Sequence, residues 1–327
     1  MEIRLIGESR AAAASNAVVL CCDKGYLPYA SLAIWTLMRS TPELDFDVCL
    51  ISTDDLELPA VIAPANVRFC QVEVDKTDSA LPTSARFSDA VYLRMLLPRL
   101  LGNDYQRLLY IDCDTMIVGS ELSKVFTLDL HGAPVGAVMD SLKMKHPKRP
   151  TFDQKAVGQD GPYFNSGVLL LDCAKYEEDG IAQACLREAR KHGPDKVYFD
   201  QTILNLALEG RWTALDMAWN WQWSVVRPMF EIWVDTQIVH FISAHKPWTD
   251  PEGKLPAVYR ETALRFLRRN FPDFPVRDFT YPRKLRKAKL FAILIRHITR
   301  LSSFVDFYRL NGGDIMRTTP PDQVRMR

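Results

Sequence analysis

The 327-residue chain lacks the features that mark secreted, disulfide-bonded and membrane-spanning proteins. No uninterrupted apolar run approaches the roughly 18 residues that a spanning helix needs. Residues 1–17 contain acidic side chains and no sustained apolar stretch, which argues against a signal peptide. The seven cysteines form no Cys-x-x-Cys pair and most lie within apolar runs. We therefore expect reduced, buried thiols in a cytosolic protein, without a zinc site or a redox pair.

A strong net charge is also absent. The formal charge of +1 gives no general reason to expect a nucleic-acid partner, and we expect none. With 47% apolar and 25% charged residues, the chain resembles an ordinary soluble globular protein with a sizeable core. The charge is unevenly spread, however. Residues 281–327 hold 11 Lys and Arg against 3 Asp, an excess of 8 positive charges, so the remainder carries a net charge of −7.

Short apolar runs alternate with helical patterns, which predicts an α/β fold with a mostly parallel sheet. The expected strands cover residues 17–22, 46–52, 67–74, 108–111, 133–139, 163–172 and 237–242. The expected helices cover residues 26–38, 84–100, 174–192, 198–208, 256–269 and 285–310. Residues 141–161 are polar and rich in Lys, Pro and Gly, which predicts a long lid or binding loop.

Two carboxylates, Asp112 and Asp114, follow the apolar run Leu108–Ile111. In open α/β sheets, ligands bind beyond the carboxyl ends of the strands, where these side chains are expected. Carboxylates at positions i and i+2 repel one another unless a cation neutralises them. Their hard oxygen atoms suit Mg²⁺ or Mn²⁺, usually shared with substrate phosphates. Two solvated aspartates at a strand end would give the same pattern, so the motif alone leaves both interpretations open.

Other candidate residues also allow two interpretations each. Asp23, at the end of the first strand, suits a nucleotide contact or a simple turn. Arg94 suits a diphosphate or a helix surface, and Asp200 suits a site or a helix cap. His240 is a core residue, or a metal ligand if it meets the two aspartates. The aromatic stretch 212–233 predicts either sugar stacking or a buried cluster.

Several motifs occur together in one order, and in that order the chain resembles the retaining glycosyltransferases of family 8. That group includes bacterial lipopolysaccharide galactosyltransferases and glucosyltransferases, and glycogenin. The matching pieces are Cys-Cys-Asp23 with Tyr26, Tyr92-Leu-Arg94, Tyr-Ile-Asp112-Cys-Asp114, Asp140 after Val-Gly-Ala-Val-Met, Tyr-Phe-Asn165-Ser-Gly167, Tyr198-Phe-Asp200-Gln201, Trp-Asn220 and His240-Phe-Ile-Ser-Ala-His-Lys246-Pro-Trp248. Each motif is weak alone, and their shared order makes the resemblance strong.

The resemblance implies a GT-A fold, a Rossmann-like sheet with helices on both sides, over residues 1–275. It implies that Asp112, Asp114 and His240 bind Mn²⁺, with Mg²⁺ as a substitute, and that the metal holds the diphosphate of a UDP-sugar. Nucleotide or diphosphate contacts are implied for Asp23, Tyr26, Arg94, Asp112, Cys113 and Lys246. Catalytic or donor-sugar contacts are implied for Asp140, Asn165, Asp200 and Gln201.

The implied reaction moves glucose or galactose from a UDP-sugar to a glycan or glycolipid, with retention, in the synthesis of lipopolysaccharide or another surface polysaccharide. Gln201 would be a poor nucleophile, which favours front-face attack over a covalent intermediate. Two departures from the family's motifs weaken the expected phosphate and uridine contacts. Ser243 stands where the family usually has Gly, and Lys24-Gly25 follow Asp23 where the family often has Asn or Asp.

Residues 276–327 form a basic tail in which apolar side chains recur at spacings of three and four. These are Phe291, Leu294, Ile298, Leu301, Val305 and Tyr308. A basic amphipathic helix of this kind predicts attachment to an anionic membrane surface, here the inner face of the cytoplasmic membrane. Packing of the same stripe on the catalytic domain or on a partner is the alternative.

Two other classes of protein compete with a glycosyltransferase. Asp112-Cys-Asp114-Thr115 resembles the nucleophile motif of haloacid-dehalogenase-type phosphatases, but Gly313-Asp314 lacks the second aspartate that such enzymes carry four residues later. A non-catalytic nucleotide-sugar-binding protein is the other alternative. Pure binding would not need all the implied catalytic residues, which argues against it.

Overall fold

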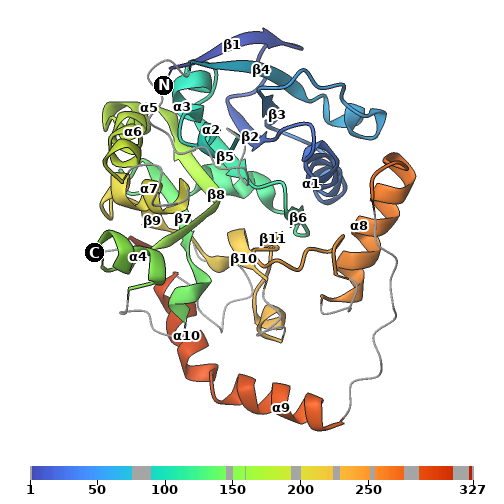
Figure 1. Ribbon diagram of the computed structural model, residues 1–327, viewed down its shortest axis with the longest axis vertical. Helices are drawn as coiled ribbons and strands as arrows, with labels where there is room; N and C mark the ends of the chain where they lie inside the picture. The colour runs from blue at the N-terminus through green and yellow to red at the C-terminus, as the bar shows by residue number, and fades with distance from the viewer. Residues whose placement is uncertain are drawn as a thin grey trace.

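The computed structural model describes residues 2–75, 90–144, 150–158, 160–192, 200–223, 229–250, 255–275, 287–311 and 324–325. Its centre is a nine-stranded sheet in the order β1-β4-β3-β2-β5-β8-β7-β9-β12 (Figure 1). The strands are β1 (Glu2–Glu8), β2 (Asn16–Cys21), β3 (Asp47–Ser52), β4 (Arg68–Asp75), β5 (Arg107–Ile111), β7 (Val135–Met139), β8 (Phe164–Asp172), β9 (Thr213–Ala214) and β12 (Val324–Arg325).

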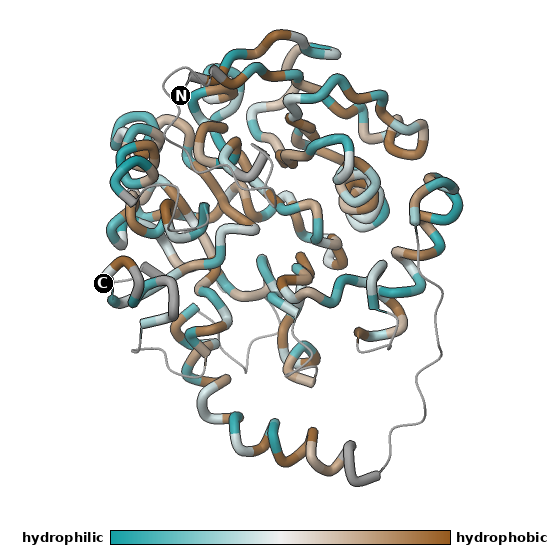
Figure 2. The backbone as a smooth tube through the Cα atoms, in the orientation of Figure 1, coloured by the Kyte–Doolittle hydropathy of each residue, from teal (hydrophilic) through white to brown (hydrophobic). Residues whose placement is uncertain are grey.

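Strands β4, β3, β2 and β5 run parallel and are neighbours in the sheet. Most of their apolar side chains are buried, as expected for parallel strands that are covered on both faces. Hydrophobic stretches of the chain are brown in Figure 2. Helix α1 (Leu27–Ser40) connects β2 to β3 in a β-α-β unit. Helices α5, α6 and α7 lie on one side of the strands in Figure 1, and α1 and α8 on the other. The predicted α/β class is therefore confirmed.

Two antiparallel pairings bring distant segments to the carboxyl end of β5. Strand β8 pairs with β5 so that Val168 faces Ile111, which puts the start of β8 beside the end of β5. A small sheet has the order β10-β11-β6, from β6 (Thr115–Ile117), β10 (Trp221–Gln222) and β11 (Ile238–His240). In it, His240 pairs with Thr115. Both pairings bring candidate site residues close to Asp112 and Asp114.

Several helices are shorter than predicted. The helices after α1 are α2 (Ala90–Leu93), α3 (Leu97–Leu101), α4 (Phe152–Val157), α5 (Cys173–Glu178), α6 (Ile181–His192), α7 (Asp200–Leu208), α8 (Ala257–Asn270), α9 (Lys287–Ile298) and α10 (Leu301–Leu310). Of the predicted helix 84–100, residues 84–89 lie outside the described residues, and the rest is α2 and α3. Pro98, in the first turn of α3, has no N–H to continue a helix from α2. The predicted helix 174–192 divides at Gly180, whose φ is +61°.

Two segments differ from the sequence-based expectation. The predicted loop 141–161 contains the 3₁₀ helix η3 (Ser141–Met144) and α4. Helix α4 begins with a capping box, in which Thr151 Oγ1 accepts from the Gln154 N–H and Gln154 Oε1 accepts from the Thr151 N–H. Residues 145–149 and 159 of that loop lie outside the described residues. At the N-terminus, β1 is an edge strand that the sequence analysis missed.

The tryptophans of residues 212–233 belong mainly to the core. Trp212, Trp219, Trp221 and Trp223 are buried, whereas Trp233 is 46% exposed. The buried-cluster interpretation is therefore the correct one for the first four. The seven cysteines are also buried and free, as predicted.

The tail contains two helices where one was predicted. Helix α10 packs into the core, because Phe304 stacks on Phe230 with ring centroids 4.3 Å apart. Asn311, just after α10, accepts a hydrogen bond of 2.9 Å from the Met139 N–H of β7. Helix α9 lies at the periphery in Figure 1 and exposes apolar side chains. No described helix has the length and apolarity required to cross a bilayer.

Candidate active site

The two carboxylates lie on the short connection between β5 and β6. The Asp112 N–H donates to the Gly167 carbonyl of β8 at 2.8 Å, and the Asp114 carbonyl accepts from the Phe241 N–H at 3.0 Å. Each aspartate is thus fixed to a different neighbouring strand end. The expected position beyond the carboxyl end of a central parallel strand is where the structure puts them.

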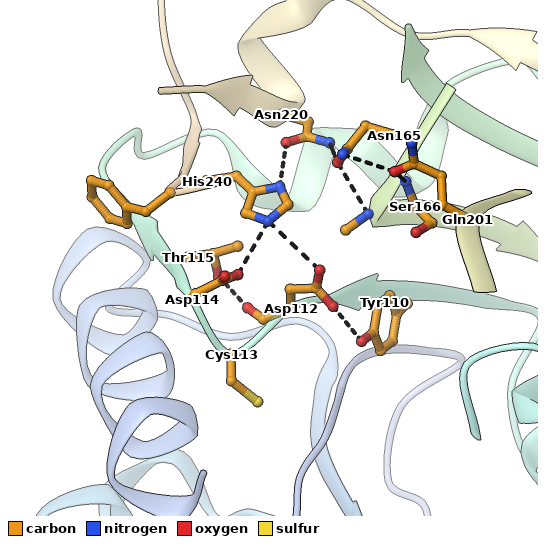
Figure 3. Close-up of polar contacts among 12 residues, drawn as sticks. Tyr110, Asp112, Cys113, Asp114, Thr115, Asn165, Ser166, Gln201, Asn220 and His240 are labelled. Atoms are coloured by element: carbon orange, nitrogen blue, oxygen red, sulfur yellow. Dashed lines mark hydrogen bonds and ion pairs between the residues drawn. The ribbon is translucent and has the colours of Figure 1, made fainter. Parts of the chain in front are cut away.

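His240 comes from β11 and faces both carboxylates (Figure 3). Its Nε2 lies 3.1 Å from Asp114 Oδ1 and 3.6 Å from Asp112 Oδ2. One ligand atom from each of the three residues lies within 4.8 Å of the others. The predicted trio is therefore brought together, so His240 meets the condition that was set for a metal-ligand candidate.

The chemistry of this trio fits a divalent cation. Asp114 Oδ1 is buried and accepts no hydrogen bond, although buried polar atoms are normally satisfied. Gly167 leaves room for the cluster, because a Cβ there would lie 2.1 Å from His240 Cε1 and 2.7 Å from Asp112 Oδ2. Two carboxylates and an imidazole nitrogen form a donor set that suits Mn²⁺ well and Mg²⁺ less well.

Each of the two carboxylates is paired with a cationic side chain. Arg94 Nη2 lies 3.0 Å from Asp112 Oδ1, and Lys246 Nζ lies 2.5 Å from Asp114 Oδ2. Burial by itself raises the pKa of the Asp114 carboxyl, but its contacts with His240 and Lys246 outweigh burial and hold the pKa well below its usual value. Asp114 is therefore ionised over the physiological range, as a metal ligand must be.

Arg94 also reaches a second carboxylate. Its Nη1 lies 3.0 Å from Asp200 Oδ2, and the hydroxyl of Ser166 donates to the same Asp200 oxygen at 3.1 Å. Burial disfavours the charged guanidinium, but the carboxylates of Asp112 and Asp200 raise the pKa of Arg94 overall. Burial and the charge of Asp112 raise the pKa of Asp200, against the effect of Arg94. Arg94 is therefore a buried bridge between the metal-site candidate and α7, and not a surface residue.

Tyr110 is a site residue that the sequence analysis missed. Its hydroxyl donates to Asp112 Oδ1 at 2.5 Å, and the Arg94 guanidinium lies 4.6 Å from its ring centroid. The available signal was the period of two along β5, which puts residues 110 and 112 on the same face.

The four predicted donor-sugar residues form one connected group. Gln201 Nε2 donates to Asp140 Oδ2 at 2.9 Å, and Gln201 Oε1 accepts from Asn165 Nδ2 at 3.0 Å. Asp200 precedes Gln201 at the start of α7 and is buried, so it does more than cap a helix. Asn220, which was recognised in a motif without a role, connects this group to His240.

The residues predicted for the nucleotide end are less clearly engaged. Asp23 Oδ1 accepts from the Tyr26 N–H at 2.9 Å, which is the plain turn interpretation. Tyr26 is 53% exposed, and burial together with the charge of Asp114 raises its pKa. The Cys113 thiol points away from them (Figure 3) and donates to the Cys21 carbonyl at 3.3 Å. Only the backbone of Cys113 faces the site.

Ser243 is the residue that stands where the family usually has Gly. Its hydroxyl accepts from the His245 N–H at 3.2 Å and donates to the His245 carbonyl at 3.1 Å. The side chain is therefore tied to its own turn, close to Lys246, whose ammonium group also donates to the Phe241 carbonyl.

A site with these parts can hold a divalent cation and a polyanion next to a polar, amide-lined region. Residues 17–252 match the family model of glycosyl transferase family 8. The chain belongs to this family. The predicted family membership is thereby confirmed, and it gives no support to a phosphatase that uses Asp112 as nucleophile.

The GT-A fold is also confirmed. The galactosyltransferase LgtC, in complex with donor and acceptor sugar analogs, superposes with a TM-score of 0.60 and 22% identity, covering 76% of this chain and 95% of that one. The WbbM bifunctional glycosyltransferase gives a TM-score of 0.59 at 16% identity, covering 82% of this chain and 51% of that one. At these identities, the similarity to the two structures shows a shared fold and nothing further.

Relatives within the family are moderately similar. General stress protein A of Bacillus subtilis is 28% identical over 198 residues, 56% of this chain and 66% of that protein. The lipopolysaccharide 1,2-glucosyltransferase of Escherichia coli is 26% identical over 243 residues, 69% of this chain and 70% of that protein. Against glycosyltransferase GlyF of Streptococcus pneumoniae, the chain spans 57% of the relative's length.

Proposed function

We propose that the chain is a metal-dependent retaining glycosyltransferase that moves a hexose from a UDP-sugar to a glycan or glycolipid. The observation that carries the proposal is the convergence of Asp112, Asp114 and His240 in a member of glycosyl transferase family 8. The orphaned oxygen of Asp114 supports a cation at that point. Mn²⁺ is the proposed metal, with Mg²⁺ as a substitute.

In this proposal, the residues around the trio bind and neutralise the diphosphate. A bound cation supplies Lewis-acid stabilisation of the charge that develops on the UDP leaving group. Lys246 and Arg94 add positive charge next to the carboxylates, so they also stabilise the negative charge on the leaving group. Tyr26 and Asp23 are the proposed contacts for the uridine end, and the weaker engagement of Asp23 makes Tyr26 the stronger of the two.

Asp140, Asn165, Asp200 and Gln201 are the proposed donor-sugar residues. Gln201 Oε1 already accepts hydrogen bonds from Asn165 Nδ2 and from the Ser166 N–H, so it is poorly suited to attack the anomeric carbon. Asp200 is paired with Arg94 and Ser166. Because neither side chain is free to act as a nucleophile, we favour front-face attack with retention, in which these oxygens stabilise an oxocarbenium-like centre.

The acceptor class rests on the relatives. The Escherichia coli relative is named a lipopolysaccharide 1,2-glucosyltransferase, and a Salmonella typhimurium relative, 23% identical over 244 residues, a lipopolysaccharide 1,3-galactosyltransferase. We therefore propose a glucose or galactose donor and an acceptor in lipopolysaccharide or another surface polysaccharide, met at the cytoplasmic face of the membrane.

Helix α9 is the proposed membrane contact. Phe291 is 64% and Ile298 is 71% exposed, and both belong to the predicted apolar stripe. Arg296 is exposed on the same helix. Each Lys or Arg near an anionic surface contributes about 1 kcal/mol. The later stripe residue Tyr308 is buried in α10, so the stripe divides between a surface helix and the core.

This division changes how the membrane proposal is tested. Truncation after Tyr281 would remove α10 from the core, so point substitutions are preferable. We expect Phe291→Ser/Ile298→Ser to release the protein from anionic vesicles at low salt, while Ser302→Ala, on the exposed start of α10, leaves binding unchanged. If the wild type itself fails to co-sediment with such vesicles, the membrane proposal is wrong.

A donor screen tests the enzymatic proposal. Release of UDP is measured from UDP-glucose, UDP-galactose and UDP-N-acetylglucosamine, each with and without Mn²⁺, and the product with the best donor is analysed by NMR. We expect Mn²⁺-stimulated release with one of the two hexoses and an α-linked product. A β-linked product contradicts retention, and tight UDP binding without turnover would indicate a non-catalytic binding protein.

A further inference from the structure

A continuous chain of side-chain hydrogen bonds connects His240 to Asp140. Figure 3 shows this chain from His240 to Gln201. His240 Nδ1 lies 3.1 Å from Asn220 Oδ1, and Asn220 Nδ2 donates to Asn165 Oδ1 at 2.9 Å. Asn165 Nδ2 donates to Gln201 Oε1, and Gln201 Nε2 donates to Asp140 Oδ2. The five side chains come from β7, β8, α7, η4 (Met217–Asn220) and β11, or from the residue that follows them. We name this set the amide relay.

Fixed groups at several points determine the direction of every bond in the relay. Asp140 Oδ2 accepts from Gln201 Nε2, so Gln201 turns its NH₂ group toward Asp140. The backbone N–H of Ser166 can only donate, at 3.1 Å, to Gln201 Oε1. In the same way, the N–H of Gly167 donates to Asn165 Oδ1 at 3.1 Å, which leaves the Asn165 NH₂ group for Gln201.

The same reasoning determines which ring nitrogen of His240 carries a proton. Because Asn165 Oδ1 faces Asn220, Asn220 must offer its NH₂ group there and its oxygen to His240. A carbonyl oxygen can only accept, so Nδ1 of His240 must carry the proton. The lone pair of a neutral imidazole is then on Nε2, the atom that lies toward Asp112 and Asp114.

We propose that Asn220 is a positioning residue that holds His240 in the tautomer and orientation needed for metal binding and couples this ligand to the donor-sugar residues. The inference rests on the proposed metal site. Asn220 is only 1% exposed and lies between the two halves of the site, so its two ends serve different functions. Its oxygen supports His240, and its NH₂ group supports Asn165.

Two substitutions separate these ends. Asn220→Leu removes both hydrogen bonds and keeps the branched shape of the side chain. Loss of a hydrogen bond that orients a metal-binding histidine typically weakens metal binding by about 10- to 100-fold. Asn220→Asp keeps an acceptor for the His240 Nδ1–H but cannot donate to Asn165 Oδ1. We expect it to bind Mn²⁺ no more weakly than the wild type while its kcat with the UDP-hexose falls.

The experiment is an Mn²⁺ titration of the full-length protein without donor, in which free Mn²⁺ is followed by electron paramagnetic resonance. Asn311→Leu is the matched control, because Asn311 is also a fully buried amide but lies at the end of α10. It should lower the melting temperature and leave Mn²⁺ affinity unchanged.

The outcomes distinguish this inference from the proposed function. Failure of the wild type to bind Mn²⁺ overturns the metal site and the inference with it. If the wild type binds Mn²⁺ and Asn220→Leu binds it with equal affinity, the inference is overturned and the proposed metal site is not. Equal loss in Asn220→Asp and Asn220→Leu overturns the assigned direction of the relay. If Asn220→Leu does not fold, Asn220→Asp carries the test through its split between metal affinity and kcat.

Discussion

The substitution Gly167→Ala tests whether the three candidate ligands act as one site. A Cβ at this position would lie 2.1 Å from His240 Cε1 and 2.7 Å from Asp112 Oδ2. Carbon atoms in ordinary contact are about 3.5 Å apart, so the imidazole must move by more than about 1 Å. A misplacement of about 1 Å costs on the order of 100-fold in rate where catalysis depends on geometry.

The assay for this variant measures Mn²⁺ affinity and UDP release on the same protein. We expect Mn²⁺ binding weakened by about 10-fold or more and turnover reduced by about 100-fold. The added methyl group also overpacks β8, which should cost about 1–3 kcal/mol of unfolding free energy. A loss of stability alone would therefore not show that the three candidate ligands act as one site.

Gly136→Ala on β7 supplies the matched control. Its Cβ would lie 2.7 Å from Leu130 Cδ2 and 3.0 Å from Leu215 Cδ2, in the apolar core of the same sheet. It should lower the melting temperature similarly, yet keep wild-type affinity for Mn²⁺. Wild-type Mn²⁺ affinity in Gly167→Ala would refute the reasoning, because the ligands would then not share the space that this glycine leaves.

Three further predictions concern single side chains. Asp114→Asn removes a charged ligand and should reduce turnover by about 100-fold or more while the melting temperature stays high, as followed by UDP release and thermal unfolding. Gln201→Ala should bind UDP normally but turn over slowly, because its contacts are to Asn165 and Asp140 and not to the nucleotide end; equal losses in UDP affinity and kcat would show that Gln201 is misplaced. Asp216 is fully buried, and burial raises its pKa to about 7, so the native state holds a proton that the unfolded state releases near its ordinary pKa of about 4. Wild-type stability should therefore fall from about pH 4 to pH 7, and urea unfolding of Asp216→Asn should lack this fall.

The local signals in the sequence explain why the strands and the carboxylates were predictable. Buried parallel strands leave continuous apolar runs, so β2, β3 and β5 could be recognised from composition and length. Asp112 and Asp114 break such a run at its end, which is a local feature. The resemblance to family 8 then supplied His240, whose partner strand β6 lies more than a hundred residues earlier.

Features that depend on distant contacts were not predictable. The orientation of β8 is antiparallel to β5, and this pairing alone brings Asn165 and Gly167 to the carboxylates. The stripe of the tail has one helical period, yet Phe291 is exposed and Tyr308 is buried. Helix α10 packs Phe304 on Phe230, whereas α9 reaches Phe230 through His297, which is not part of the stripe. Hydrophobic spacing identifies a face of a helix but not what covers it.

Hydrogen-bond partners of amides are the least visible in a sequence. Asn220 stood in a recognised motif, but nothing in its neighbours along the chain shows that it contacts both His240 and Asn165. Its two contacts arise because η4 leads directly into β10, which pairs with β11.

The most direct test of the central claim is the rate of UDP release from the preferred UDP-hexose, measured on one enzyme preparation in Mn²⁺ and in excess EDTA. The account predicts turnover in Mn²⁺, a nearly complete loss in EDTA, and recovery when Mn²⁺ is restored, because Asp112, Asp114 and His240 form a site that requires a cation. Undiminished UDP release in excess EDTA would contradict it.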